Sequence, residues 1–160
     1  MSYTLAEIRE DVRRLMAGLI FPGSIEAPGA WVDWVPTYTS LTIGNGTVAA
    51  RYTRIGNTIH AYWSIVFGTT TSVAAGLAIS APVAGSVSPN QENTIGTVMV
   101  FDAAPVARYN GFVMYESGLL LPRVGVASCA YLTNTFIGGG NPILFATNDS
   151  VALSVTYEAA

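Results

Sequence analysis

The segment TVAARYTRIGNTIHAYWSIVF, residues 47–67, decides the fold, because it holds two strand-like runs joined by a turn. In the second run, apolar residues alternate with a more polar set; the two sets are Ile59, Ala61, Trp63, Ile65 and Phe67, and His60, Tyr62, Ser64 and Val66. A period of two places these sets on opposite faces of a β-strand. The residues Ile55-Gly56-Asn57 between the runs favour a turn. The segment therefore predicts strands over 47–54 and 58–67.

The same texture continues through the rest of the chain from Trp31 onward. Short apolar runs alternate with clusters of Gly, Pro and Asn, and further strands are predicted at 77–81, 94–101, 111–116, 128–133 and 150–157. In the last run, Val151, Leu153, Val155 and Tyr157 share one face. Many short strands with turn signals predict a mainly β domain over 31–160, an antiparallel β-sandwich or a jelly-roll-like fold.

Residues 1–21 have a different pattern, that of one short amphipathic helix. Thr4 and Glu7 are spaced as a capping box. Behind them, apolar residues recur at alternating spacings of three and four, the spacing of a coiled-coil seam: Leu5, Ile8, Val12, Leu15 and Leu19. The Gly- and Pro-containing linker 22–30 separates this helix from the β domain, which favours a coiled coil between copies over packing on the chain's own domain. These five residues are the predicted oligomerisation or attachment residues.

Composition narrows the classes of partner. Of the 160 residues, 51% are hydrophobic and only 11% are charged, which favours burial of surface against copies or within a larger particle. The net charge of −3 argues against a nucleic-acid partner. No apolar run approaches the roughly 20 residues of a membrane span, and no positively charged signal peptide is present at the N-terminus. We therefore expect synthesis in the cytoplasm, without membrane insertion.

Side chains suited to catalysis are few. His60 is the single histidine, so any Ser-His-Asp or Cys-His arrangement would depend on it, and a surface or interface role is the favoured interpretation. Cys129 is the single cysteine, and a structural zinc site within one chain is not expected. The carboxylates of the β domain are scattered singly: Asp33, Glu92, Asp102, Glu116, Asp149 and Glu158. The sequence predicts no catalytic residue, no metal and no cofactor. A carbohydrate-cleaving enzyme using two of these carboxylates is the weakest of the interpretations.

Aromatic residues are the most prominent binding feature of the β domain. Tyr62, Tyr109 and Tyr115 are candidate ligand contacts, because an aromatic ring offers a stacking face to a sugar. Packing in the core or at a subunit interface is the competing interpretation for each ring.

Three segments carry a resemblance to a known family. They are residues 34–41 (WVPTYTSL), 44–48 (GNGTV) and 50–60 (ARYTRIGNTIH), and residues 67–72 and 79–83 continue the pattern. Together they resemble a module of tailed-phage virion proteins, the C-terminal β domain of minor tail and tail-fibre proteins, notably of phages of actinobacteria. The resemblance implies a trimeric β domain exposed on the virion and carries no enzymatic signature.

From this resemblance and the helical seam we expect a phage virion surface protein. In the leading interpretation it is a homotrimer of the tail-fibre or tail-tip type, which binds glycans of the host envelope and contacts other virion proteins. In the alternative it is a capsid decoration or head-fibre protein anchored by its N-terminal helix. The alternative arises because the module begins about thirty residues after Met1.

Overall fold

A computed structural model describes residues 29–86, 93–127 and 132–160. The chain divides into two compact units, Met1–Ala30 and Trp31–Ala160, and the description below concerns the second. The predicted helix over 1–21, with its five seam residues, lies outside the described residues, as does most of the linker.

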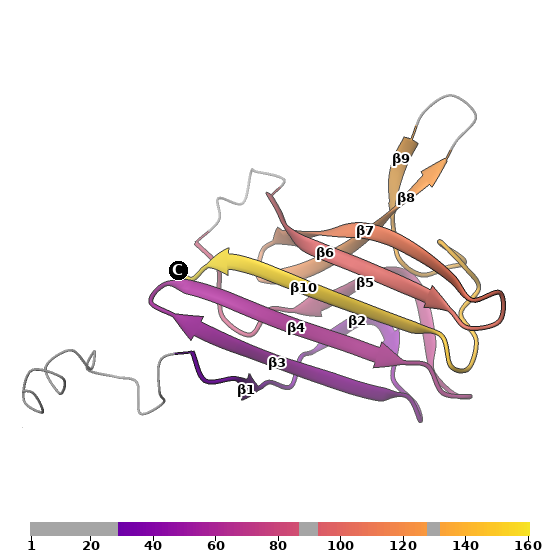
Figure 1. Cartoon of the computed structure of the whole chain (residues 1–160), viewed down its shortest axis with the longest axis horizontal. Helices are drawn as coiled ribbons and strands as arrows, with labels where there is room; N and C mark the ends of the chain where they lie inside the picture. The colour runs from indigo at the N-terminus through magenta and orange to yellow at the C-terminus, as the bar shows by residue number, and fades with distance from the viewer. Residues whose placement is uncertain (1–28, 87–92, 128–131) are drawn as a thin grey trace, which may run out of the picture. The chain divides into compact units, whose positions relative to one another are not determined.

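The second unit consists of strands that form a single sheet (Figure 1). In chain order they are β1 (Val32–Asp33), β2 (Tyr38–Thr42), β3 (Thr47–Ile55), β4 (Thr58–Val66), β5 (Ser72–Ser80), β6 (Asn93–Asp102), β7 (Ala107–Glu116), β8 (Leu119–Ala127), β9 (Leu132–Phe136) and β10 (Ser150–Glu158). The order across the sheet is β1-β3-β4-β10-β6-β7-β8-β5-β2, with β9 beside β8, and all pairings are antiparallel.

The sheet curls into a half-barrel, with β3, β4, β10 and β6 on one side and β5 and β2 behind them (Figure 1). This confirms the prediction of a mainly β, antiparallel domain. The strands make one continuous curled sheet in place of two separate stacked sheets. Among the described residues there is no helix to cover the apolar face, so the sheet buries that face against itself.

The hairpin predicted at 47–67 is confirmed as β3 and β4, which pair from Thr47↔Val66 to Ile55↔Thr58. The predicted apolar set, four residues of β4 and Phe67 directly after it, lies inside and is at most 2% exposed: Ile59, Ala61, Trp63, Ile65 and Phe67. On its other side β4 pairs along its full length with β10, whose inward residues Val151, Leu153 and Val155 are equally buried. Each such buried side chain contributes about 1.5–3 kcal/mol of transfer free energy, so β4 and β10 form the centre of the core.

The structure confirms most, but not all, of the other predicted strands. The runs at 77–81, 94–101, 111–116 and 150–157 lie almost wholly within the longer strands β5, β6, β7 and β10. Of the run at 128–133, residues 128–131 lie outside the described residues and the remainder belongs to β9. The sequence analysis missed β8, because Pro122 interrupts its apolar run. It also missed β2, where a bulge at Ser40 (φ 64°) breaks the alternation.

The two ends of the strand order are joined by four residues of the WVPTY motif, Trp34 to Thr37. At one end of this connection, Trp34 N donates to Ala50 O of β3 (3.1 Å). At the other end, Thr37 N donates to Ser80 Oγ (2.8 Å) and Ser80 N donates to Thr37 O (2.9 Å), which fastens it to β5. The motif therefore bridges the open side of the half-barrel between β1 and β2.

A side-chain contact reinforces this bridge from inside. Trp63 is fully buried in β4, and its Nε1 donates to the hydroxyl of Tyr38 in β2 over 3.1 Å. The two rings are tilted, with centroids 6.0 Å apart. Burial raises the pKa of Tyr38, while the hydrogen bond from Trp63 acts in the opposite direction. The pair ties a central strand to the edge strand of the opposite side.

The glycine-rich segments 44–47 and 67–72 form a second fastening, here named the turn lock. Asn45 Nδ2 donates to Thr69 Oγ1, and Asn45 Oδ1 accepts from Thr70 N and Thr70 Oγ1, each over 2.9 Å. Thr71 Oγ1 donates to Ile43 O over 2.6 Å. Gly68 is required beside this network, because a Cβ there would lie 2.2 Å from Asn45 Oδ1. These motif residues have a folding role.

The Trp63–Tyr38 contact gives the first prediction. We expect Tyr38→Phe to lower the free energy of unfolding by about 1–2 kcal/mol, because it leaves a buried indole N–H without its acceptor. Urea denaturation followed by tryptophan fluorescence measures the change. Tyr52→Phe is the matched control, since the Tyr52 hydroxyl makes no hydrogen bond within the described part of the chain. An equal loss in both variants would contradict the role of this hydrogen bond.

The turn lock gives the second prediction. Asn45→Ala removes three side-chain hydrogen bonds and should cost about 1–2 kcal/mol. Asn45→Asp keeps the acceptor for Thr70 and loses only the donor to Thr69, so its cost should be smaller. Thermal unfolding of both variants tests this ranking. A loss for Asn45→Asp that matches or exceeds the loss for Asn45→Ala would show that the acceptor is unimportant.

Candidate functional site

The outer face of the sheet carries a groove over β4, β10, β6 and β7. Strand alternation turns Tyr62 and Ser64 of β4 away from the core, and the register sets outward residues of the next strands beside them. One cross-strand row runs Tyr62↔Ser154↔Thr97, and the adjacent row runs Ser64↔Ala152↔Met99↔Asn110. Residues far apart in the sequence thus meet on one surface.

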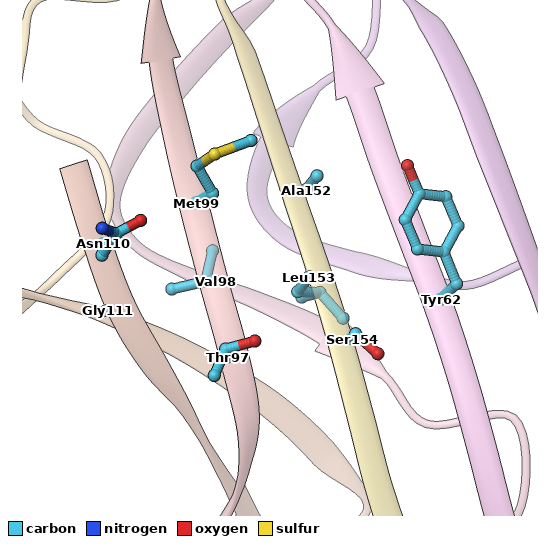
Figure 2. A pocket seen from close by; sticks show the side chains of 9 residues that line it. All are labelled: Tyr62, Thr97, Val98, Met99, Asn110, Gly111, Ala152, Leu153 and Ser154. Atoms are coloured by element: carbon cyan, nitrogen blue, oxygen red, sulfur yellow. The ribbon is translucent and has the colours of Figure 1, made fainter. Parts of the chain in front are cut away.

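The groove is hollow because its centre holds short side chains. Ala152 and Ser154 of β10 form the floor, with Tyr62 standing on one side and Met99 and Asn110 on the other (Figure 2). Its volume is about 360 Å³. The complete lining is Tyr62, Thr97, Val98, Met99, Asn110, Gly111, Ala152, Leu153 and Ser154.

The chemistry of this lining suits binding of a neutral, hydroxyl-rich group. Tyr62 supplies an aromatic face, and the hydroxyls of Ser154 and Thr97 and the amide of Asn110 donate and accept hydrogen bonds. No acid, histidine or cysteine is among the nine lining residues. The groove is equipped to hold a ligand and offers no group for proton transfer near neutral pH.

A second hollow, of about 770 Å³, lies next to the groove and shares Tyr62 with it. Its lining combines the outward-facing Ser64 and Arg51 and the exposed Asp33 of β1 with core-facing residues of β2 and β3 and with part of the 34–37 connection. The Arg51 guanidinium lies 5.8 Å from the centroid of the Tyr62 ring and 5.2 Å from that of Trp31. Tyr62 therefore lines both hollows.

The three predicted ligand-contact tyrosines are placed differently by the structure. Tyr62 lines both hollows. Tyr109 faces inward from β7 and packs against the core. Tyr115 is only 5% exposed, its hydroxyl accepts a hydrogen bond from Gly85 N, and its ring stacks on Tyr157 at 5.3 Å. The structure does not bring these three together, and Tyr115 offers no ring face to a surface ligand.

Sequence reasoning missed the polar partners of Tyr62 in the groove. Ser154 carried a signal, since the alternation of β10 already placed it opposite the apolar set. Thr97 and Asn110 had none, because their position beside Tyr62 depends on the pairing of β10 with β6 and of β6 with β7.

The other chemistry-bearing side chains have local partners. His60 Nδ1 lies 2.9 Å from Thr156 Oγ1 on the outer face. Asp149 is 2% exposed and accepts hydrogen bonds from Ala103 N (2.9 Å) and Ala146 N (2.7 Å), so it organises two loops. Burial raises the pKa of Tyr157 to about 12, and its hydroxyl donates to Val83 O.

In residues 29–86, 93–127 and 132–160 no group of three or more His, Cys, Asp or Glu side chains is arranged to hold a metal ion. They also contain no helix with the length and hydropathy of a bilayer span. Cys129 and Glu92 lie outside the described residues.

Comparisons with protein-family models, with curated proteins and with solved structures found no match for this chain.

Proposed function

We propose that this protein is a phage virion surface protein of the tail-fibre or tail-tip type, whose β domain binds host-envelope glycans through the groove beside Tyr62. The observation that carries the glycan part is the composition of the groove: one aromatic face beside a floor of short side chains, bordered by hydroxyl and amide groups. A sugar ring presents an apolar C–H face and a rim of hydroxyls, which this lining complements.

The dimensions of the groove support a saccharide. Its volume of about 360 Å³ lies near the lower end of the roughly 300–1,000 Å³ typical of small-molecule sites. The groove lies on the face of a sheet and adjoins a second hollow past Tyr62. A short stretch of a longer polysaccharide therefore has room to continue past Tyr62.

The virion assignment is supported by the sequence resemblance of residues 34–60. In that assignment copies associate into a trimer through the predicted seam, namely Leu5, Ile8, Val12, Leu15 and Leu19, which lies outside the described residues. The low proportion of charged residues, 11%, agrees with a surface partly covered by copies or by other virion proteins. The proposal assigns the protein no catalytic step.

The groove gives the third prediction. We expect Tyr62→Ala to weaken binding to purified host cell-envelope polysaccharide about tenfold, equivalent to about 1.4 kcal/mol, because the stacking face is lost. Tyr62→Phe keeps the ring and should retain most of the affinity. Val66→Ala, on the outer face of the same strand and away from the groove, is the matched control. Surface plasmon resonance measures all three. Unchanged affinity in Tyr62→Ala would remove the groove from the proposal.

The virion assignment gives the fourth prediction. Quantitative mass spectrometry of separated heads and tails from purified particles should find the protein in the tail fraction, in multiples of three copies. Replacement of Leu5, Ile8, Val12 and Leu15 by Ser should dissociate the trimer in analytical ultracentrifugation. Recovery with the heads would favour the capsid decoration protein, and absence from both fractions would refute a virion role.

A further inference from the structure

A single cross-strand row crosses the whole outer face and passes through the groove. Each member is the direct register partner of the next, so their side chains project from the same face of the sheet. The row runs Asp33, Arg51, Tyr62, Ser154, Thr97, Phe112, Arg123 and Phe136. An arginine therefore stands immediately beside the tyrosine of the groove.

The Arg51 guanidinium lies beside aromatic rings and has no polar partner among the described residues. It lies near the Trp31 and Tyr62 rings, at 5.2 and 5.8 Å from their centroids. Among the described residues it makes no hydrogen bond or ion pair. A guanidinium held by aromatic faces keeps its N–H edge available, in the fork geometry that matches a carboxylate or a phosphate.

Of the remaining described arginines, Arg54 and Arg123 have polar partners within the described residues, whereas Arg108, like Arg51, has only an aromatic one there. Arg54, on the same strand, directs its Nε to Gly56 O over 2.8 Å. Arg123 directs Nη1 to Asn134 Oδ1 over 3.1 Å and lies over the Phe136 ring at 4.1 Å. Arg108 lies over the Phe101 ring at 5.1 Å, two residues along β7 from Asn110. Arg51 is the arginine that shares a hollow with Tyr62.

The separation between Arg51 and the groove suits one continuous ligand. Adjacent strands lie about 4.8 Å apart, so Arg51 is one strand spacing beyond Tyr62 and two beyond Ser154. A saccharide stacked on Tyr62, with its hydroxyls at Ser154 and Thr97, carries its next substituent toward Arg51.

On these grounds we infer that the glycan is anionic: a saccharide whose carboxylate group is held by Arg51 while a sugar ring stacks on Tyr62. The inference rests on the proposed glycan-binding function and specifies its ligand class. Arg51 would set the preference for charge, and the groove would bind the sugar itself.

Asp33 opposes this preference. It is the register partner of Arg51 on β1, is exposed, and lies at the edge of the same hollow. Its carboxylate repels an anionic ligand at Arg51 and reduces the local positive potential. Removal of this charge should therefore strengthen binding of an acidic saccharide, an effect that a purely structural role of Asp33 does not produce.

The test uses the full chain and an array of oligosaccharides in matched forms, oligogalacturonate, oligoglucuronate and oligoalginate, each as the free acid and as the neutral methyl ester. Wild-type protein should bind at least one free acid about tenfold more tightly than its ester. Arg51→Gln should reduce acid binding to the level of the ester and leave ester binding within about twofold. Arg51→Lys should fall between, and Asp33→Asn should bind the acid more tightly.

Arg54→Gln is the matched control, because it removes the same charge from the same strand at a side chain held at the turn. Equal binding of acid and ester by wild type, or an equal effect of Arg54→Gln and Arg51→Gln, would overturn the inference. If Tyr62→Ala then still weakens binding of the esters about tenfold, the glycan-binding groove stands. If the wild-type protein binds none of the free acids and none of the esters, both the inference about Arg51 and the proposed glycan-binding function are overturned.

Discussion

Burial of Trp63 is the constraint on which the curled sheet depends. A sheet with one apolar face must cover that face, and the described part of the chain has no helix that does so. The sheet therefore bends until β2 lies across from β4, where Tyr38 accepts the Trp63 N–H. Only the four residues from Trp34 to Thr37 separate β1 from β2, so this short connection joins the two ends of the strand order directly.

The sequence pattern predicts most of the individual strands but little of how the strands pair with one another. Alternation of apolar and polar residues predicted β3, β4 and β10, and the buried faces of β4 and β10 are those expected. It failed where the alternation is interrupted, by Pro122 in β8 and by the bulge at Ser40 in β2. The curl depends on contacts such as Tyr38–Trp63, which join residues with no shared local pattern.

In the candidate site, too, the sequence pattern predicts which way a side chain faces but not which residues lie beside it. Alternation alone predicts that Tyr62 faces away from the core, because Ile59, Ala61 and Trp63 face toward it. Tyr115 could not be separated from Tyr62 in this way, since its burial follows from stacking on Tyr157, a residue of another strand. The partners of Tyr62 in the groove are fixed by pairings between β4, β10 and β6. The residues of the WVPTY and glycine-rich motifs mostly hold strands of the sheet together, and Trp34, Val35, Pro36 and Tyr38 also line the hollow that shares Tyr62 with the groove.

The position of β10 has a consequence for the order of events during synthesis. It is the last strand of the described chain, yet it lies between β4 and β6, with Val155 paired to both Ala61 and Gly96. Until β10 leaves the ribosome, β4 and β6 have no strand between them, and the floor of the groove does not exist. Completion of the core and of the groove is thus a single late step, so nascent chains that have not yet added β10 expose apolar strands and lack the floor of the groove.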